Sequence, residues 1–187
     1  MNLTAPLKIS KAEFYEFVQQ SEGRFEWERG LIVQQMTGGT LKHGGLALRF
    51  RDALVRQLGF DNFIATVADR GVETNETIRY PDVVLEPIGA DGNSLATTVP
   101  ALVVEILSKT SKQRDLSAKP VEYTSLDSLH AYIVASQDGP ECWVWVRGAD
   151  RGFPADAARI AGQDQVIAVP SLGITLELAE IYRAIGS

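Results

Sequence analysis

The sequence predicts one α/β domain in which a mixed central β-sheet is flanked by helices. The 187 residues are enough for one substantial core and too few for two ordinary domains, so we expect residues 1–187 to form a single domain. Segments with helical periodicity alternate with short apolar runs of strand length, which is the pattern of an α/β protein. Hydrophobic residues make up 45% of the chain and charged residues 22%, as in a compact globular protein.

The first predicted elements are a helix and a hairpin. The helix covers about residues 11–20 and begins after Ser10, because Ser10 and Glu13 can form a capping box. The segment FEWERGLIVQQM then alternates apolar and polar residues on both sides of Arg29-Gly30. This alternation around a turn signal predicts two strands joined as a hairpin.

The middle of the chain predicts a second helix and three strands. Apolar residues recur with nearly helical spacing over about residues 43–58, and Gly59 stands where a helix end is expected. The runs IATVA, PDVVLE and ALVVEIL have the length of strands. The last two are almost continuously apolar, which is typical of strands buried at the centre of a sheet.

The last third predicts a third helix and two further pairs of strands. A polar stretch, SKTSKQRDLSAK, leads into a helical segment that ends near Leu126. HAYIVAS and ECWVWVR flank Asp138-Gly139 and therefore predict a hairpin. The tail VIAVPSLGITLELAEIYRAI predicts a short strand pair and a final helical turn.

Composition and charge restrict the location and the function class. The N-terminus has no apolar run of signal-peptide length, and no segment approaches the roughly 20 apolar residues of a membrane span. Cys142 is the single cysteine, which excludes an internal disulfide and a multi-cysteine zinc site. We therefore expect a cytoplasmic protein without membrane contact. The net charge of −6 argues against a protein that coats DNA but allows an enzyme with a local acidic metal site.

Two carboxylates stand where central strands should be apolar. Asp82 follows Pro81 at the start of VVLE, and Glu105 interrupts the apolar run ALVVEIL. A buried carboxylate shifts its pKa, pairs with a base or binds a metal, and two on neighbouring strands would repel each other without a cation. A site for Mg²⁺ or Mn²⁺ is one interpretation. Solvent-facing strand ends or salt bridges are the other.

A lysine near the two carboxylates would complete a phosphodiesterase site. In sites of this kind the lysine normally stands two residues after the second carboxylate, but Leu107 occupies the position here. Lys119 follows on the predicted helix, with Asp115 four residues before it and Tyr123 four after, so the three share one face. Lys119 can reach the site from that helix or form an ordinary surface pair with Asp115. Pro120 would disturb the helix unless it falls in the first turn.

Basic residues close to these carboxylates are candidates for phosphate binding. Lys109, Lys112 and Arg114 make the segment after Glu105 basic in an otherwise acidic protein, which suits a rim that faces phosphates. His43, at the start of the second helix, could also contact a phosphate. A solvated loop and a partly exposed residue next to a helix cap are the alternative interpretations.

With these motifs in order, the chain resembles the Uma-two family, a large bacterial group of restriction endonuclease-like proteins within the PD-(D/E)xK nuclease superfamily. The resemblance covers nearly the whole chain. It rests on RFEWERGLIVQQM followed by His43, on YPDVVLE, PALVVEILS and HAYIVAS, on the spacing of Asp115, Lys119 and Tyr123, and on VPSLGITLELAEIY. The chain departs from the family pattern at Lys109, Ala131 and Ala135-Ser136.

The resemblance implies a restriction endonuclease-like core, a homodimer and a site of four residues. Carried over by position, these are Glu26, Asp82, Glu105 and Lys119, with Glu26 assisting a metal-bound water or a second metal ion. The resulting hypothesis is a Mg²⁺- or Mn²⁺-dependent nuclease that acts on nucleic acid, DNA in particular. The alternative is a dimeric binding module that keeps the fold without the chemistry. A third hypothesis keeps the metal and changes the substrate to another phosphoester.

Overall fold

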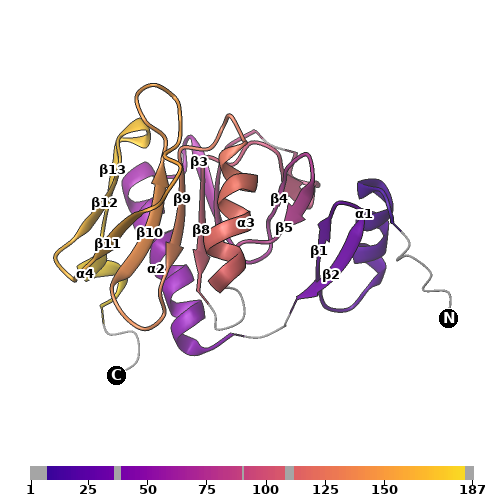
Figure 1. The fold of residues 1–187 in the computed structure, drawn as a ribbon, viewed down its shortest axis with the longest axis horizontal. Coiled ribbons are helices and arrows are strands. Elements are labelled where there is room, and N and C mark those ends of the chain that lie inside the picture. The colour runs from indigo at the N-terminus through magenta and orange to yellow at the C-terminus, as the bar shows by residue number, and fades with distance from the viewer. Residues whose placement is uncertain (1–7, 36–38, 90, 108–111, 184–187) are drawn as a thin grey trace.

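The computed structural model describes residues 8–35, 39–89, 91–107 and 112–183, with the side chains of 112–114 excepted (Figure 1). Within these ranges the chain forms a six-stranded sheet, a five-stranded sheet and a strand pair, together with four α-helices. No helix in the described part of the chain is both long and apolar enough to cross a membrane.

The six-stranded sheet is the centre of the fold. In spatial order its strands are β11 (Ala158–Ala161), β10 (Glu141–Val146), β9 (Ala131–Ala135), β8 (Leu102–Ile106), β6 (Val83–Pro87) and β3 (Phe63–Val67). Only β8 and β9 run parallel, and α3 (Lys112–Thr124) connects them; the other neighbours are antiparallel. The sheet is therefore mixed, as predicted.

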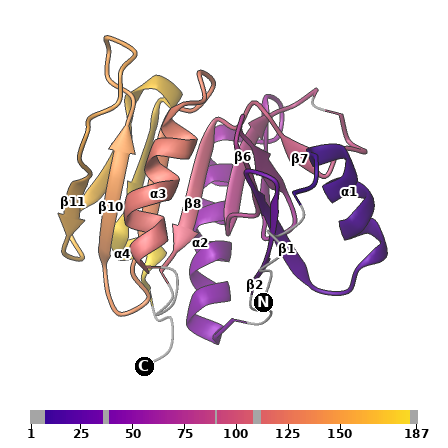
Figure 2. The same ribbon diagram turned by 45° about the vertical axis from the view of Figure 1, so that its right-hand side comes forward.

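Helices cover the two faces of this sheet. The helix α2 (Leu41–Leu58) lies on one face and α3 on the other (Figures 1 and 2). Because strand residues alternate between faces, Val104 packs with the α2 side chains while Val103 packs beside Tyr123 of α3. The same alternation turns Glu105 toward α3.

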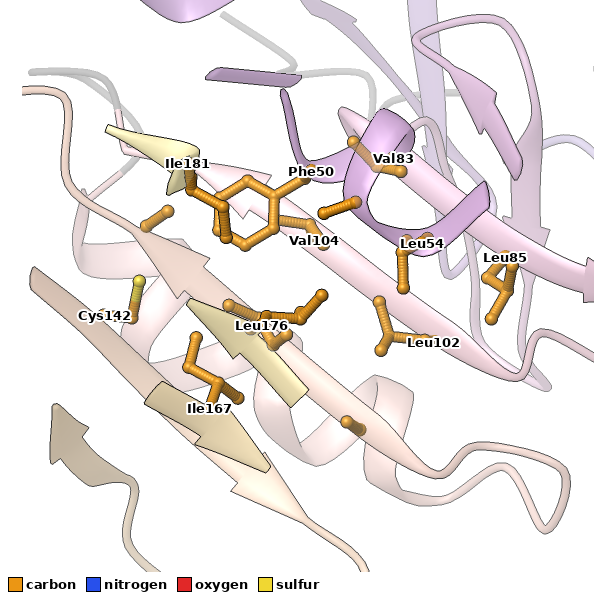
Figure 3. Packing of buried hydrophobic residues seen from close by; sticks show 14 of the residues in the cluster. Phe50, Leu54, Val83, Leu85, Leu102, Val104, Cys142, Ile167, Leu176 and Ile181 are labelled. Carbon is orange, nitrogen blue, oxygen red and sulfur yellow. The ribbon is translucent and has the colours of Figure 1, made fainter. Parts of the chain in front are cut away.

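The main core lies between α2 and the central sheet. Phe50 and Leu54 of α2 are fully buried against Val83, Leu85, Leu102 and Val104 (Figure 3). The C-terminal elements close this core: β12 (Val166–Val169), the short 3₁₀ helix η1 (Pro170–Leu172), β13 (Ile174–Glu177) and α4 (Leu178–Ile181). They include the predicted strand pair and final helical turn.

Of the five-stranded sheet, the sequence predicted only the first hairpin. Its order is β2 (Leu31–Gln35), β1 (Arg24–Glu28), β5 (Thr77–Arg79), β4 (Gly71–Glu73) and β7 (Ala96–Thr97). The predicted turn between β1 and β2 has positive φ at both Arg29 (50°) and Gly30 (95°), as a two-residue hairpin turn requires. The helix α1 (Lys11–Gln20) packs on this sheet through Phe14 and begins with the predicted Ser10–Glu13 capping box.

Candidate active site

Asp82 and Glu105 meet where β6 and β8 run side by side. The register pairs Val83 with Val104, which puts the two carboxylate residues next to each other across the strand pair. The Ile106 backbone N–H donates a hydrogen bond of 2.7 Å to Asp82 Oδ2 and fixes that side chain. Glu105 is 5% exposed. A carboxylate buried to this extent shifts its pKa, binds a metal or pairs with a partner of opposite charge.

Lys119 of α3 is that partner. Its Nζ lies 2.6 Å from Glu105 Oε1 and 2.9 Å from Asp115 Oδ1, one turn earlier in the helix. Tyr123, one turn later, donates a hydrogen bond of 3.1 Å to the same oxygen of Glu105. Pro120 lies inside α3, which continues to Thr124. The proline therefore does not prevent Lys119 from reaching Glu105.

Negative charge exceeds positive charge around Glu105. Burial raises the pKa of Glu105 to about 8. The carboxylates of Asp115 and Asp82 add to this rise, and Lys119 opposes it. Burial by itself would lower the pKa of Lys119, but attraction to Glu105 and Asp115 outweighs it and the net shift is upward. Lys119 is thus a charged ammonium that does not fully balance the acidic groups beside it.

His43 contacts the other carboxylate. It lies in the first turn of α2, and its Nε2 is 3.4 Å from Asp82 Oδ2. This contact raises the pKa of His43, partial burial opposes the rise, and the charge of Glu105 adds to it. His43 was predicted as a phosphate contact, and the structure places it at the site beside Asp82.

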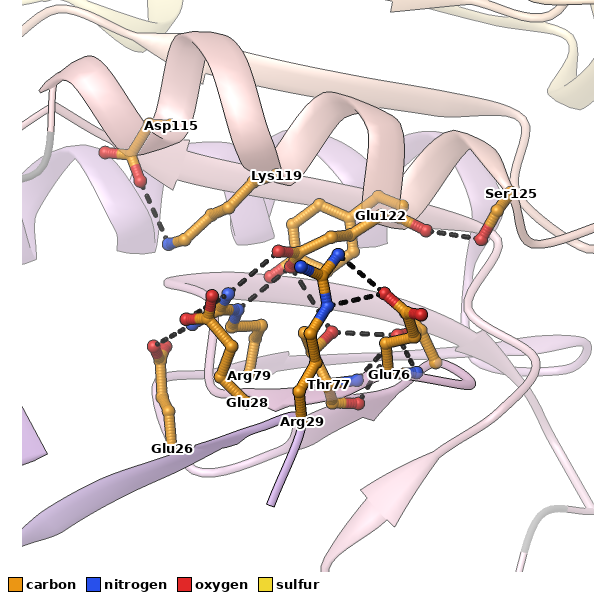
Figure 4. Close-up of polar contacts among 12 residues, drawn as sticks. Glu26, Glu28, Arg29, Glu76, Thr77, Arg79, Asp115, Lys119, Glu122 and Ser125 are labelled. Carbon is orange, nitrogen blue, oxygen red and sulfur yellow. Dashed lines mark hydrogen bonds and ion pairs between the residues drawn. The ribbon is translucent and has the colours of Figure 1, made fainter. Parts of the chain in front are cut away.

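Glu26 belongs to a neighbouring group of charges. It lies on β1, is buried, and accepts hydrogen bonds of 2.9 Å at Oε2 from Arg79 Nη1 and from Gln35 Nε2. Figure 4 shows Arg79 among Glu26, Glu28 and Glu122, below the segment of α3 that carries Lys119. Among the described contacts, Glu26 is therefore joined to Arg79, while Asp82, Glu105 and Lys119 converge with Asp115, Tyr123 and His43.

Sequence reasoning did not identify Arg79 or Glu122. Arg79 stands in the short strand TIR, close to Asp82 in the sequence. A charged arginine in so short a strand is the one sequence feature that could have marked it as a candidate. Its main partner, Glu122, is on α3, and no sequence pattern links the two. Of the remaining predicted phosphate contacts, Lys109 lies outside the described residues, and Lys112 and Arg114 begin α3 with side chains outside them.

The pair of carboxylates suits a hard divalent cation better than a multi-ligand metal centre. In the described part of the chain, no group of three or more His, Cys, Asp or Glu side chains is placed to hold a metal ion. Mg²⁺ commonly binds through one or two carboxylates and keeps several waters. Asp82 and Glu105 fit this mode. Burial is the main cause of the raised pKa of Glu105, and the charges of Asp115 and Asp82 add to it, so a cation between Asp82 and Glu105 would favour the ionised form of Glu105.

Comparison with known proteins places the chain in a family. The model of the Uma2 family, described as "Putative restriction endonuclease", matches residues 12–179. "Uncharacterized protein sll1609" of Synechocystis sp. is 27% identical over 143 residues, which cover 73% of this chain and 80% of that protein. The crystal structure of "a putative nuclease belonging to DUF820" from Anabaena variabilis has a TM-score of 0.73 at 15% identity, over 92% of this chain and 98% of that one. The chain thus has the restriction endonuclease-like α/β fold and belongs to the Uma2 family.

Proposed function

We propose that the protein is a metal-dependent nuclease that hydrolyses phosphodiester bonds in nucleic acid, with DNA as the first substrate to test. The observation that supports it is the convergence on Glu105 of Asp82, which lies beside it at the start of β6, and of Lys119, which reaches it from α3. Glu105 and Lys119 are buried and the side chain of Asp82 is 14% exposed. The family description and the nuclease title of the structural neighbour point to the same reaction class.

In this proposal Asp82 and Glu105 hold Mg²⁺ or Mn²⁺, which when bound polarises a phosphoryl oxygen and lowers the pKa of water. The Ile106 N–H and His43 orient Asp82, and Tyr123 orients Glu105. The binding groups are thus held in place before substrate arrives, which reduces the reorganisation that the reaction requires.

Lys119 acts as a charged donor in this mechanism. Its pKa is raised, so at neutral pH the ammonium keeps its proton and does not serve as the base. A fixed ammonium next to Glu105 can donate hydrogen bonds to the attacking water and offset the negative charge that develops on the phosphoryl group. Loss of that charge should therefore lower kcat more than it raises KM.

The test uses the full chain, Mg²⁺ or Mn²⁺, and both single- and double-stranded DNA. We expect wild-type protein to cut, and Asp82→Asn, Glu105→Gln and Lys119→Met to lose most of the activity while circular dichroism shows the fold retained. Asp61→Asn is the matched control, because Asp61 is an exposed carboxylate outside the site. Equal cutting by wild type and the three site variants would refute the proposal, and DNA binding without cutting would favour the binding-module alternative.

Assembly and location remain predictions. The family resemblance implies a homodimer, which light scattering on the purified chain would distinguish from a monomer. A cytoplasmic location is expected from the sequence and is tested by fractionation of the source cells.

A further inference from the structure

Arg79 is fully buried and contacts three carboxylates at once. Its Nε and Nη2 donate to Glu122 Oε2 and Oε1 at 2.9 and 2.8 Å, which is a two-pronged contact. Nη1 donates to Glu26 at 2.9 Å and Nη2 to Glu28 at 3.0 Å. The guanidinium is 0% exposed, and its described contacts are with Glu26, Glu28 and Glu122. The group adjoins the cluster around Glu105, because the charge of Glu26 helps to raise the pKa of Lys119 and the charge of Lys119 helps to lower that of Glu122.

These contacts join the two parts of the fold that flank the candidate site. Arg79 lies on β5, and Glu26 and Glu28 lie on the neighbouring strand β1 of the five-stranded sheet. Glu122 lies on α3 between Lys119 and Tyr123, the two residues that contact Glu105. Arg79 therefore connects the five-stranded sheet to the turn of α3 that supplies both contacts (Figure 4).

The chemistry of the group indicates a geometric role. A buried ion pair contributes little net stability, since desolvation of the charges offsets much of their attraction. A planar guanidinium that binds a carboxylate through two parallel hydrogen bonds fixes the relative orientation of the two side chains as well as their distance. A lysine ammonium does not. Glu26 supplies a second buried counter-charge, with its Oε2 shared between Arg79 and Gln35.

We propose that Arg79 is a positioning residue that clamps α3 against the five-stranded sheet, so that Lys119 and Tyr123 meet Glu105. In this arrangement Glu26 serves as a partner of Arg79 and not as a metal ligand. The inference rests on the proposed nuclease function for its catalytic consequence, while the clamp itself is a property of the fold.

Arg79→Lys is the main test, because it keeps the charge and removes the two-pronged contact. We expect kcat on DNA to fall about 10- to 100-fold with KM little changed, since small displacements of a reacting group have effects of that size. Glu122→Gln should change kcat in the same direction. Arg29→Lys is the matched control: Arg29 also pairs with a glutamate, Glu76, but both side chains are more than half exposed.

Two further measurements distinguish positioning from a general structural effect. In a Lys119→Met background, Arg79→Lys should reduce kcat much less than in wild type, because the group that it positions is gone. In hydrogen exchange, amides of residues 116–124 should exchange faster in Arg79→Lys while the urea midpoint of global unfolding changes little. Additive losses of kcat, or unchanged exchange in α3, would overturn the proposal.

Titration with Mn²⁺ tests the assignment of Glu26. We expect Glu26→Gln to bind Mn²⁺ like wild type, while Asp82→Asn and Glu105→Gln bind it weakly. A loss in Glu26→Gln equal to that in Asp82→Asn would make Glu26 a ligand and overturn its place in the clamp. If wild type proves unable to cut DNA, the proposed function fails, and the exchange measurement on α3 still decides whether Arg79 is a clamp.

Discussion

Tyr123 shows how one hydroxyl group can be tested apart from the fold. The ring is fully buried against Tyr132, with the two ring centroids 5.0 Å apart, and the hydroxyl donates to Glu105 Oε1. Tyr123→Phe keeps the packing and removes the hydrogen bond. A hydrogen bond to a charged group contributes about 1.5–3 kcal/mol, and Glu105 is charged when it binds the metal. We therefore expect kcat to fall about 10- to 150-fold in steady-state assays on DNA.

Tyr132→Phe is the control for this variant. Tyr132 is equally buried, and its hydroxyl donates to the backbone carbonyl of Asp115 at 3.0 Å, whereas that of Tyr123 donates to Glu105. We expect a similar loss of unfolding free energy in urea and an unchanged kcat. If Tyr132→Phe lowers kcat as much as Tyr123→Phe, the effect of Tyr123 is one of packing and not of its contact with Glu105.

A site residue can be predicted from the sequence only where a local pattern marks it. Asp82 and Glu105 were identified because a carboxylate in an apolar strand has a recognisable cost. Lys119 was identified through its helical spacing to Asp115 and through the family resemblance. Arg79 could not be found in this way, since its pairing with Glu122 joins a strand to a distant helix and no local pattern encodes that contact.

At the scale of elements, the junction between β5 and α3 gives the fold a specific dependence on pH. Partial burial would raise the pKa of Glu122, but its hydrogen bonds and ion pair with Arg79 outweigh this, so the pKa is lower than the usual 4.5. A carboxylate whose pKa is lowered by folding stabilises the fold above pH 4.5, and that contribution is lost as pH falls through the folded-state pKa.

Glu122→Gln should therefore have a lower free energy of unfolding than wild type at pH 7. The difference between the two free energies should become smaller on acidification below pH 4.5. Urea unfolding followed by fluorescence between pH 7 and pH 3 measures both free energies. A matched comparison is Glu180→Gln, which removes an exposed pair with Arg56 on the opposite side of the core. If the difference in unfolding free energy between wild type and Glu122→Gln stays constant with pH, the lowered pKa of Glu122 is contradicted.

The elements that sequence reasoning located are those with a local signature. The Ser10–Glu13 capping box, the periodic apolar face of α2 and the turn at Arg29-Gly30 each predicted an element that the structure contains. The strands β4, β5 and β7 have two or three residues each, too few to show alternation. β4 and β5 pair with each other as neighbours in the sequence, but β5 also pairs with β1 and β4 with β7, which are distant. The sequence therefore did not predict the five-stranded sheet.

Pro120 illustrates the same limit within a helix. Local chemistry predicts that proline ends or disturbs a helix outside its first turn, because it removes one hydrogen bond and crowds the preceding turn. Here α3 continues past Pro120, which is buried and lines a pocket together with Leu116 and the tryptophans of β10. Packing on the central sheet thus maintains a helix that its own sequence disfavours.

At the scale of the whole molecule, the two sheets place the candidate site at their junction. The central sheet provides Asp82 and Glu105, and α3 brings Lys119 over them from one face while α2 brings His43. The five-stranded sheet contributes through Arg79, which reaches the same helix. Each part of the fold therefore bears on the geometry around Glu105, although the strands that do so are far apart in the sequence.

The net charge of −6 makes a further prediction about how the whole molecule meets DNA. An acidic protein gains little from long-range attraction to phosphates, so binding must come from a few basic side chains near the site. If about three phosphates are contacted, log Kobs for a duplex should fall with log salt concentration with a slope of about −2.7, and for a single strand about −2.1. Fluorescence anisotropy in EDTA, where divalent cations cannot support cleavage, measures both slopes. A duplex slope of about −6 or steeper would instead require a broad basic surface. With 18 basic and 24 acidic residues, the chain could supply such a surface only if its lysines and arginines were clustered on one face.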